Sequence, residues 1–325
     1  MMSIRSEVVG FGHCLPEKIL TNDDLSHMVE TSDEWIATRT GIRSRHVAQD
    51  ETTSMIAERA ISNALQSAGL QPSDVDLLIV ATVTPDKTTP STATLIAGRL
   101  NFRVGVPAFD ISAACSGFVY ALTLADNMIR LGEVKTAVVV GAECLSNIVD
   151  WTDRNTCVLF GDGAGAVVLR ALEGKGDSSD VGVLSTCIYS DGHLAEFLQT
   201  TGGVSTTKNA GFVSMNGKEV FKHAVVSLSE AAETALQKAG IDKSQIDWLV
   251  PHQANIRIID SVAERLEIPA QKVIVALDHH GNTSAASIPL ALSENVQNGR
   301  LKKGDVVVLT AMGAGFTWGG AVIRL

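Results

Sequence analysis

The chain has 325 residues, 45% of them hydrophobic, and a formal net charge of −10. That length and apolar content support a large core in one or two domains, whereas the negative charge argues against general binding of nucleic acid. Five scattered cysteines without a CxxC pair predict neither a disulfide framework nor a metal site, and they favour a reducing, cytoplasmic location. The longest apolar runs have the length of strands, so we expect no membrane span.

Strand-like and helix-like segments alternate along the first half. Strands are predicted over residues 3–12, 75–82, 134–143 and 164–170, and helices over 33–40 and 52–68. Residues 21–24 (Thr-Asn-Asp-Asp) can cap the start of a further short helix, and Gly69 can close the helix that ends at 68. The hydrophilic stretch 171–180 is the best boundary candidate, so we divide the chain into residues 1–175 and 176–325.

The second half repeats the first at an offset of 171 residues. Residues 64–80 and 235–251 share eight identities in seventeen aligned positions. A repeat of this length is too long for a solenoid and indicates two α/β halves of similar topology, with mixed sheets and helices on their faces. Facing each other, the two halves would bring equivalent elements together in one cleft. At this offset Cys115 corresponds to Ala286.

One stretch, residues 106–122, organises the first half. It begins as a short apolar strand, crosses small residues, reaches Cys115 and continues as a mostly apolar helix-like segment. This places Cys115 near the N-terminus of a helix, where unpaired N–H groups and the helix dipole favour a thiolate and therefore a nucleophile. The alternative is a buried structural cysteine, which is the usual role of a free cysteine.

Two stretches of the second half carry further chemistry. His252 follows an apolar strand at 248–251, and ligand clefts of α/β sheets form at such strand ends. Asn282 lies in the segment 278–289, the counterpart of the cysteine elbow. Taken alone, His252 could be a hydrogen-bonded structural residue and Asn282 a turn residue. Together with Cys115 they supply a nucleophile, an imidazole and an amide donor, a set suited to acyl transfer onto sulfur followed by carbanion attack.

At this point the sequence resembles a known family. Residues 110–117, 251–255 and 281–289 resemble the active-site motifs of beta-ketoacyl-acyl-carrier-protein synthase III, a thiolase-fold condensing enzyme, and 161–166 and 313–319 fit the same pattern. The resemblance covers essentially the whole chain and implies a thiolase-like fold of two duplicated α/β halves with buried central helices. His279 and His280 precede the asparagine motif, and we interpret them as structural.

The resemblance implies a mechanism. Cys115 would take the acyl group of an acyl-CoA, and malonyl-acyl-carrier-protein would then lose carbon dioxide and attack it, initiating type II fatty-acid synthesis. His252 and Asn282 would donate hydrogen bonds to the malonyl thioester oxygen. The backbone N–H groups of Cys115 and Ala314 would form an oxyanion hole, although the family carries glycine where this chain has Ala314. No metal and no cofactor beyond the CoA thioester substrate are expected.

The resemblance also implies substrate contacts. The CoA site would comprise the adenine-stacking pair Trp35 and Arg154, a phosphate contact at Arg39, and the tunnel residues Phe221 and Asn255. Without the family match, Trp35 would be an amphipathic-helix residue and the arginines a solvated surface.

The acyl pocket would involve Phe316 and Thr89. Acetyl-specific members of the family carry phenylalanine at the position of Thr89, where the side chain is expected to reach across a dimer into the neighbour's acyl pocket. Because threonine is smaller, we expect acyl chains longer than acetyl to be accepted.

Two expectations concern partners. A basic patch of Lys222, Arg257 and Arg265 would dock the acidic carrier protein, with scattered surface charge as the alternative. The family also implies a homodimer formed through the first half. Competing functions are a starter-unit condensing or acyl-transfer enzyme of secondary metabolism, a thioesterase, and a non-catalytic homologue that acts as a dimerisation partner.

Overall fold

A computed structural model describes residues 3–325 of the protein. Its main sheet has five strands in the order β1-β7-β6-β4-β5, and the second has four in the order β11-β12-β13-β8. The first sheet comprises β1 (Ser3–Cys14), β4 (Leu77–Ala81), β5 (Ala108–Ile111), β6 (Thr136–Glu143) and β7 (Gly163–Gly174). The second comprises β8 (Gly182–Ser190), β11 (Trp248–Pro251), β12 (Val306–Gly313) and β13 (Thr317–Arg324). Both sheets mix parallel and antiparallel pairs.

Short ribbons and helices complete the architecture. Two-stranded ribbons join β2 (Ile19–Thr21) to β3 (Ser44–His46) and β9 (Leu198–Thr200) to β10 (Val213–Met215). The helices are α1 (Asn22–Ser26), α2 (Asp33–Thr40), α3 (Thr53–Ala68), α4 (Thr92–Arg99), α5 (Gly117–Arg130), α6 (Gly217–Ala239), α7 (Ile256–Arg265), α8 (Leu277–His280) and α9 (Ser287–Gln297). In the part of the chain that the structure describes, no helix combines the length and apolarity that a bilayer crossing needs.

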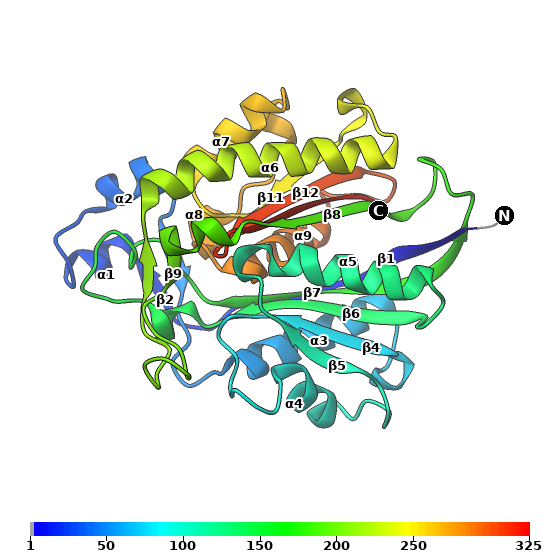
Figure 1. Ribbon diagram of the computed structural model, residues 1–325, viewed down its shortest axis with the longest axis horizontal. Helices are drawn as coiled ribbons and strands as arrows, with labels where there is room; N and C mark the ends of the chain where they lie inside the picture. The colour runs from blue at the N-terminus through cyan, green and yellow to red at the C-terminus, as the bar shows by residue number, and fades with distance from the viewer. Residues whose placement is uncertain (1–2) are drawn as a thin grey trace.

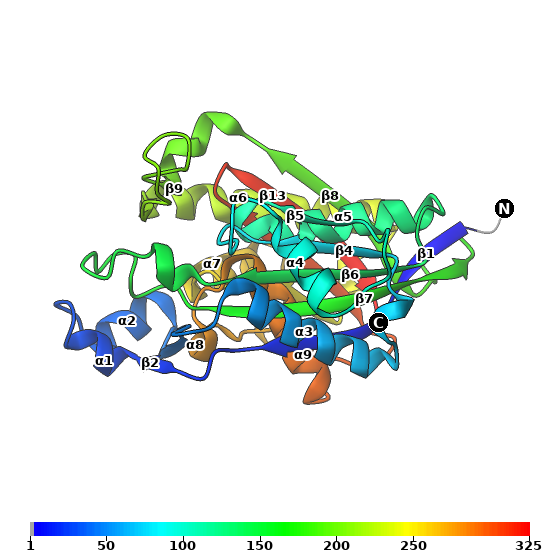
Figure 2. The ribbon, with the colours of Figure 1, turned by 90° about the horizontal axis from the view of Figure 1, so that it is seen from below.

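The elements stack in five layers (Figure 1). Helices α5 and α9 lie between the two sheets, whereas α3 and α4 cover the outer face of one sheet and α6 and α7 cover the other. Figure 2 shows the same molecule from below, with α3 and α4 in front of the first sheet. The two central helices bury apolar side chains against both sheets; examples are Phe118 and Leu122 on α5, and Ile288 and Leu292 on α9. The predicted buried central helices are therefore confirmed.

Local signals in the sequence account for the helix ends. Thr21 and Asp24 form a capping box at α1, and Gly69 and Gly240 adopt left-handed conformations that close α3 and α6. The short cap residue and the two glycines are the residue types that these positions favour. Because α3 and α6 end equivalently and each leads to a buried strand, the predicted repeat is realised in the fold.

The two elbows correct the predicted alignment by one residue. A 3₁₀ turn precedes each central helix, Ala114–Ser116 before α5 and Ser284–Ala286 before α9. Ala114 and Ser284 both have positive φ, 44° and 50°, so these two positions are equivalent. Cys115 therefore corresponds to Ala285 and not to Ala286, because the second half is one residue shorter between its buried strand and its elbow.

Candidate active site

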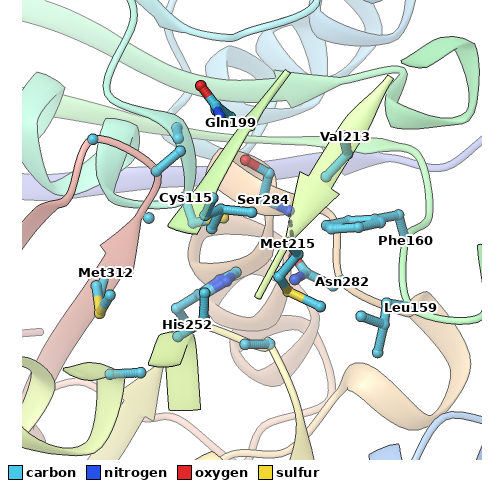
Figure 3. Close-up of a pocket in the computed structure, with 18 of the residues that line it drawn as sticks. Cys115, Leu159, Phe160, Gln199, Val213, Met215, His252, Asn282, Ser284 and Met312 are labelled. Carbon is cyan, nitrogen blue, oxygen red and sulfur yellow. Dashed lines mark hydrogen bonds between the residues drawn. The ribbon is translucent and has the colours of Figure 1, made fainter. Parts of the chain in front are cut away.

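A cavity of about 860 Å³ brings the three predicted catalytic residues together. Cys115, His252 and Asn282 all line it, and Figure 3 shows their side chains around one space. Cys115 comes from the elbow before α5, His252 from the residue after β11, and Asn282 from the loop between α8 and the second elbow. Their exposed fractions are 9%, 3% and 6%, so the polar groups are nearly withdrawn from solvent.

The thiol of Cys115 differs from the expectation in its ionisation. Its helix-terminal position is confirmed, but burial raises the pKa of the Cys115 thiol to about 12, and only the Ser284 hydroxyl and one backbone hydrogen bond oppose this. Desolvation of the charged form is the largest cause of this rise, and it acts against the thiolate that a helix N-terminus favours. Cys115 is therefore a neutral thiol in the ligand-free protein, which corrects the predicted thiolate.

The imidazole of His252 is held in one orientation. Its Nδ1 lies 2.7 Å from the Ser287 hydroxyl oxygen, and the backbone N–H of Gln253 donates to that same oxygen at 3.4 Å. Because Ser287 accepts from Gln253, its own hydrogen can be donated to Nδ1, which leaves the hydrogen of the ring on Nε2. Burial lowers the pKa of His252 to about 3, so the ring is a neutral hydrogen-bond donor.

The amide of Asn282 is oriented by its own loop. Its Oδ1 accepts a hydrogen bond from the backbone N–H of Ser284 at 2.9 Å, which is the dashed line beside Asn282 in Figure 3. Its backbone is fixed by a bond from its N–H to the Leu159 carbonyl and one from the Gly161 N–H to its own carbonyl. With the oxygen occupied, the Nδ2 hydrogens remain as the donors of this side chain.

The predicted oxyanion-hole residues lie on two neighbouring segments. Cys115 and Ala314 both line the cavity, and Gly313 packs so tightly against the elbow that a side chain there would collide with the Cys115 backbone nitrogen. Gly313 ends β12, so this close approach fixes the strand end beside the cysteine.

Three contributors to the site were not predicted from the sequence. The ribbon of β9 and β10 covers part of the cavity with Gln199, Val213 and Met215. Gln253 joins the carbonyls of Pro251 and Ile274 to the N–H of Ala276 and so supports the loop that carries His252. The hydrophilic loop around the ribbon gave no periodic signal, whereas a glutamine directly beside His252 could have been noted.

The third missed contributor is Glu143 at the end of β6. This buried carboxylate accepts hydrogen bonds from the Thr82 and Thr84 hydroxyls and from the Val83 N–H, and burial raises its pKa to about 7. The Ser284 hydroxyl interacts with both Glu143 and Cys115. A glutamate that ends an otherwise apolar strand was the available signal.

The predicted CoA residues fall into two groups. Phe221, on α6, and Asn255, the residue that caps α7, line the cavity. Trp35 lies outside the cavity lining, with the Arg39 guanidinium carbon 4.5 Å and that of Arg154 5.0 Å from its ring centroid. Two segments far apart in sequence thus bring the half-buried Trp35 and the exposed Arg39 and Arg154 into one cluster.

Neither predicted acyl-pocket residue lines the cavity. Phe316 is buried and packs against Phe197 and His223, with ring centroids 6.5 Å and 5.7 Å away. Thr89 is exposed on the loop between β4 and α4. The apolar residues that do line the cavity include Val83, Leu145 and Phe160. The assignment of Phe316 is therefore not supported by its position in this chain.

The predicted docking residues lie on the adjacent helices α6 and α7. Arg257 lines the cavity and places its guanidinium carbon 5.6 Å from the Phe221 ring centroid. Lys222 is 72% exposed and lies 3.9 Å from Glu219, and Arg265 lies 3.9 Å from Glu230. The patch therefore continues from the cavity to the surface, with acidic residues interspersed.

Comparisons with known proteins point to one family. The family model described as 3-oxoacyl-[acyl-carrier-protein (ACP)] synthase III matches residues 109–192, and the model of its C-terminal part matches 236–325. A beta-ketoacyl-[acyl-carrier-protein] synthase III of Rhodospirillum centenum is 56% identical over 99% of this chain and 100% of its own length. One from Paramagnetospirillum magneticum is 54% identical over all of both chains.

Solved structures agree. The 3-oxoacyl-[acyl-carrier-protein] synthase III of Aquifex aeolicus has a TM-score of 0.92 and 49% identity, covering 98% of this chain and 100% of its own. The priming beta-ketosynthase of the R1128 polyketide pathway is more distant in sequence, with 35% identity, a TM-score of 0.91, and coverage of 98% of this chain and 96% of its own. The fold is therefore that of a thiolase-like condensing acyltransferase. Within that class, the chain belongs to the beta-ketoacyl-acyl-carrier-protein synthase III family.

Proposed function

We propose that this enzyme condenses an acyl-CoA primer with malonyl-acyl-carrier-protein to give 3-oxoacyl-acyl-carrier-protein, the reaction that initiates type II fatty-acid synthesis. The observation that carries the proposal is the convergence of Cys115, His252 and Asn282 on one cavity. Two of these side chains are neutral donors, and the third is the only cysteine that lines the cavity among residues 3–325. That set suits a reaction in which sulfur holds an acyl group while an oxyanion forms nearby.

In the first half-reaction, the acyl group is transferred from the sulfur of CoA to the sulfur of Cys115. Its sulfur attacks the acyl-CoA carbonyl, and the tetrahedral oxyanion accepts hydrogen bonds from the backbone N–H groups of Cys115 and Ala314. Collapse breaks the carbon–sulfur bond to CoA, and the thiol proton of Cys115 ends on the departing CoA sulfur. Because burial raises the pKa of the Cys115 thiol to about 12, we propose that the proton leaves only as the sulfur attacks the bound acyl-CoA.

In the second half-reaction, the donors of the second half act on the malonyl thioester. Loss of carbon dioxide leaves an enolate whose oxygen accepts hydrogen bonds from His252 Nε2–H and Asn282 Nδ2–H. The enolate carbon attacks the acyl-cysteine carbonyl, and the Cys115 thiolate leaves and regains a proton from solvent. A neutral His252 suits this role. Its low pKa keeps the ring uncharged, and the hydrogen on Nε2 is then available as the hydrogen-bond donor.

The substrates would reach the cavity past the aromatic and basic residues at its entrance. We propose that Trp35, Arg39 and Arg154 hold the nucleotide end of CoA, and that Phe221 and Asn255 line the path of its pantetheine arm. Lys222, Arg257 and Arg265 would meet the acidic carrier protein, which explains how an enzyme with a net charge of −10 attracts an anionic partner. A homodimer formed through the first half is part of the proposal.

The experiment is intact-protein mass spectrometry after incubation with acyl-CoAs from acetyl to long chain, with Cys115→Ala as the control. The proposal predicts a gain of one acyl group in the wild type, none in the variant, and release of that group as a 3-oxoacyl product when malonyl-acyl-carrier-protein is added. Release as free acid would favour a thioesterase. No acylation by any acyl-CoA would contradict the proposal and the CoA-site assignments.

A further inference from the structure

Half of the histidines in the chain gather at one place outside the active site. His13 lies on β1, His46 on β3, and His279 and His280 on α8. His280 lies close enough to the other three histidines, and to Glu294 on α9, for their charges to shift its pKa. Imidazole and carboxylate are side chains that bind divalent metals, and neither catalysis nor the CoA site uses this group.

Three of these side chains share a common centre. His279 Nε2 lies 3.0 Å from Glu294 Oε1, and His280 Nε2 lies 3.8 Å from Glu294 Oε2. The ligand atoms of the three residues all lie within 4.8 Å of one another. A tetrahedral ion with bonds of 2.0–2.2 Å holds its ligand atoms about 3.3–3.6 Å apart, so small side-chain adjustments place all three around one ion.

The surroundings orient the ligands as they do in metal sites. Asp278 Oδ1 lies 2.8 Å from His279 Nδ1, the nitrogen that faces away from Glu294, and so fixes the ring. Glu294 and His279 are 33% and 44% exposed, whereas His280 is 5% exposed. The centre is therefore anchored on the buried side and open to solvent on the other, where water can complete the coordination.

We propose that His279, His280 and Glu294 bind a divalent transition-metal ion, with Zn²⁺ the best match to two imidazole nitrogens and one carboxylate oxygen. The ion would tie α8 to α9. Asn282 follows α8 by two residues, and Ser287, the partner of His252, begins α9. The site is a structural brace beside the active site, and the inference holds whether or not the proposed reaction is correct.

His279 is protonated when no metal is bound. The Asp278 and Glu294 carboxylates raise the pKa of His279 to about 10, so the metal-free cluster is an imidazolium between two carboxylates. Metal binding would displace that proton, as is usual for histidine ligands. The ion-pair network alone is the competing explanation, and metal-binding measurements separate the two.

The test is calorimetric titration of the untagged protein with Zn²⁺ alone, in the wild type, His279→Gln, Glu294→Gln and the matched control His193→Gln. His193 is an exposed histidine elsewhere in the chain. A Cys115→Ala arm excludes binding to the catalytic thiol. The proposal predicts one Zn²⁺ per chain, an affinity at least ~10-fold weaker in the two cluster variants, and no change in His193→Gln or Cys115→Ala.

Two further readouts guard against a folding defect. Thermal unfolding with Zn²⁺ and with EDTA should show a metal-dependent rise in midpoint for the wild type and not for the cluster variants. Co²⁺ bound to the wild type should give ligand-field absorption bands without a thiolate charge-transfer band. Absence of Zn²⁺ binding, unchanged binding in His279→Gln and Glu294→Gln, or a thiolate band would overturn the proposal.

Discussion

The two elbows of this protein share one backbone shape and carry different chemistry. Each is a 3₁₀ turn with one positive-φ residue, followed by a buried central helix. The first presents Cys115 to the cavity, whereas its equivalent in the second half, Ala285, is buried and does not line it. The second elbow instead orients Asn282 and, through Ser287, His252. Under the proposed function, the duplicated scaffold divides the reaction, with the nucleophile in one half and the hydrogen-bond donors in the other.

The packing of the elbows explains why the roles are not interchangeable. Gly117 and Gly141 leave only enough room for Ala285, because a side chain on either glycine would press against it. Ala285 thus packs against these two glycines and does not line the cavity. Cys115 is instead next to the open space and beside Gly313, which lets the strand end approach the cysteine backbone.

The largest expected effect comes from moving the cysteine between elbows. Cys115→Ala should lose acylation entirely, with activity reduced on the order of 10⁶-fold, as for the loss of other catalytic nucleophiles. The double variant Cys115→Ala, Ala285→Cys should remain inactive, because residue 285 does not reach the cavity. Intact mass after incubation with acyl-CoA measures both, and acylation of the double variant would break the distinction between the elbows.

A second prediction uses the opposite pH responses of the two halves. Burial lowers the pKa of His252 to about 3. When the pH is below 6.5, the ordinary pKa of histidine, the imidazole is therefore protonated in the unfolded chain but stays neutral in the native protein. Stability is therefore lost as pH falls from 6.5 toward 3, and at ~1.4 kcal/mol per pH unit the loss from this group reaches about 2 kcal/mol at pH 5.

Urea unfolding at pH 8 and pH 5 measures this loss. His252→Gln should lose about 2 kcal/mol less than the wild type between the two pH values. Cys115 has the opposite pH dependence, because burial raises its pKa to about 12. Above pH 9 the thiol ionises in the unfolded chain but not in the native protein, so stability is lost as pH rises. Parallel losses in the wild type and His252→Gln would show that the imidazole is not buried in its neutral form.

The smallest expected effect concerns substrate length. If Thr89 of one subunit faces the acyl pocket of its partner, Thr89→Phe should narrow the range of accepted primers toward acetyl while leaving acetyl-CoA turnover nearly unchanged. Competition between acetyl- and longer acyl-CoAs, read by intact mass, measures the shift. Thr88→Phe on the same exposed loop is the matched control, and an unchanged preference in Thr89→Phe would remove Thr89 from the pocket.

Much of the fold and the catalytic set could be predicted from local signals. Capping residues, the closing glycine Gly69 and apolar periodicity located α1, α3 and the buried strands. Cys115 and His252 could be predicted because each follows a short apolar strand, and Asn282 because its segment is the counterpart of the cysteine elbow. The thiol pKa could not be predicted, because burial depends on packing by segments distant in sequence, such as the ribbon of β9 and β10.

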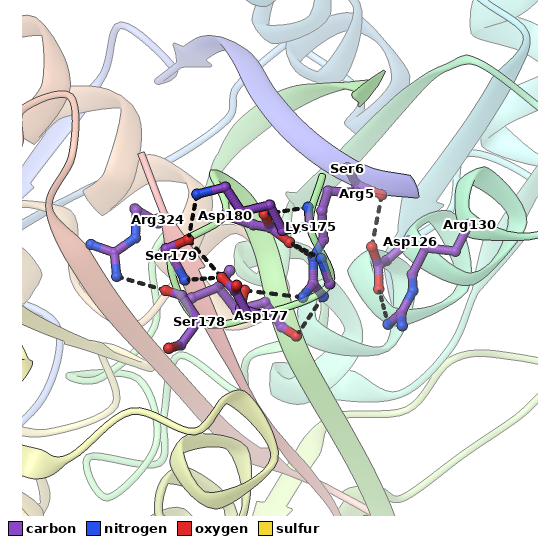
Figure 4. Close-up of polar contacts among 12 residues, drawn as sticks. Arg5, Ser6, Asp126, Arg130, Lys175, Asp177, Ser178, Ser179, Asp180 and Arg324 are labelled. Atoms are coloured by element: carbon purple, nitrogen blue, oxygen red, sulfur yellow. Dashed lines mark hydrogen bonds and ion pairs between the residues drawn. The ribbon is translucent and has the colours of Figure 1, made fainter. Parts of the chain in front are cut away.

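The connection between the halves shows a similar limit. Residues 171–180 are hydrophilic and were expected to be a boundary, but β7 continues to Gly174 and the rest is tied down on both sides (Figure 4). The buried Arg5 on β1 pairs with Asp180 at 2.9 Å, and Arg324 on β13 donates to the Ser178 carbonyl. Composition alone does not reveal such long-range partners, so the division at residue 175 stays a prediction.

The division of labour is tested most directly by measuring both half-reactions on the same three variants. Acylation is followed by intact mass with acyl-CoA, and decarboxylation by carbon dioxide release from malonyl-acyl-carrier-protein. His252→Ala and Asn282→Ala should each slow decarboxylation ~10²–10³-fold while acylation stays within about tenfold of the wild type. Cys115→Ala should abolish acylation and still decarboxylate. Loss of acylation in His252→Ala and Asn282→Ala to the same degree as decarboxylation would contradict the account.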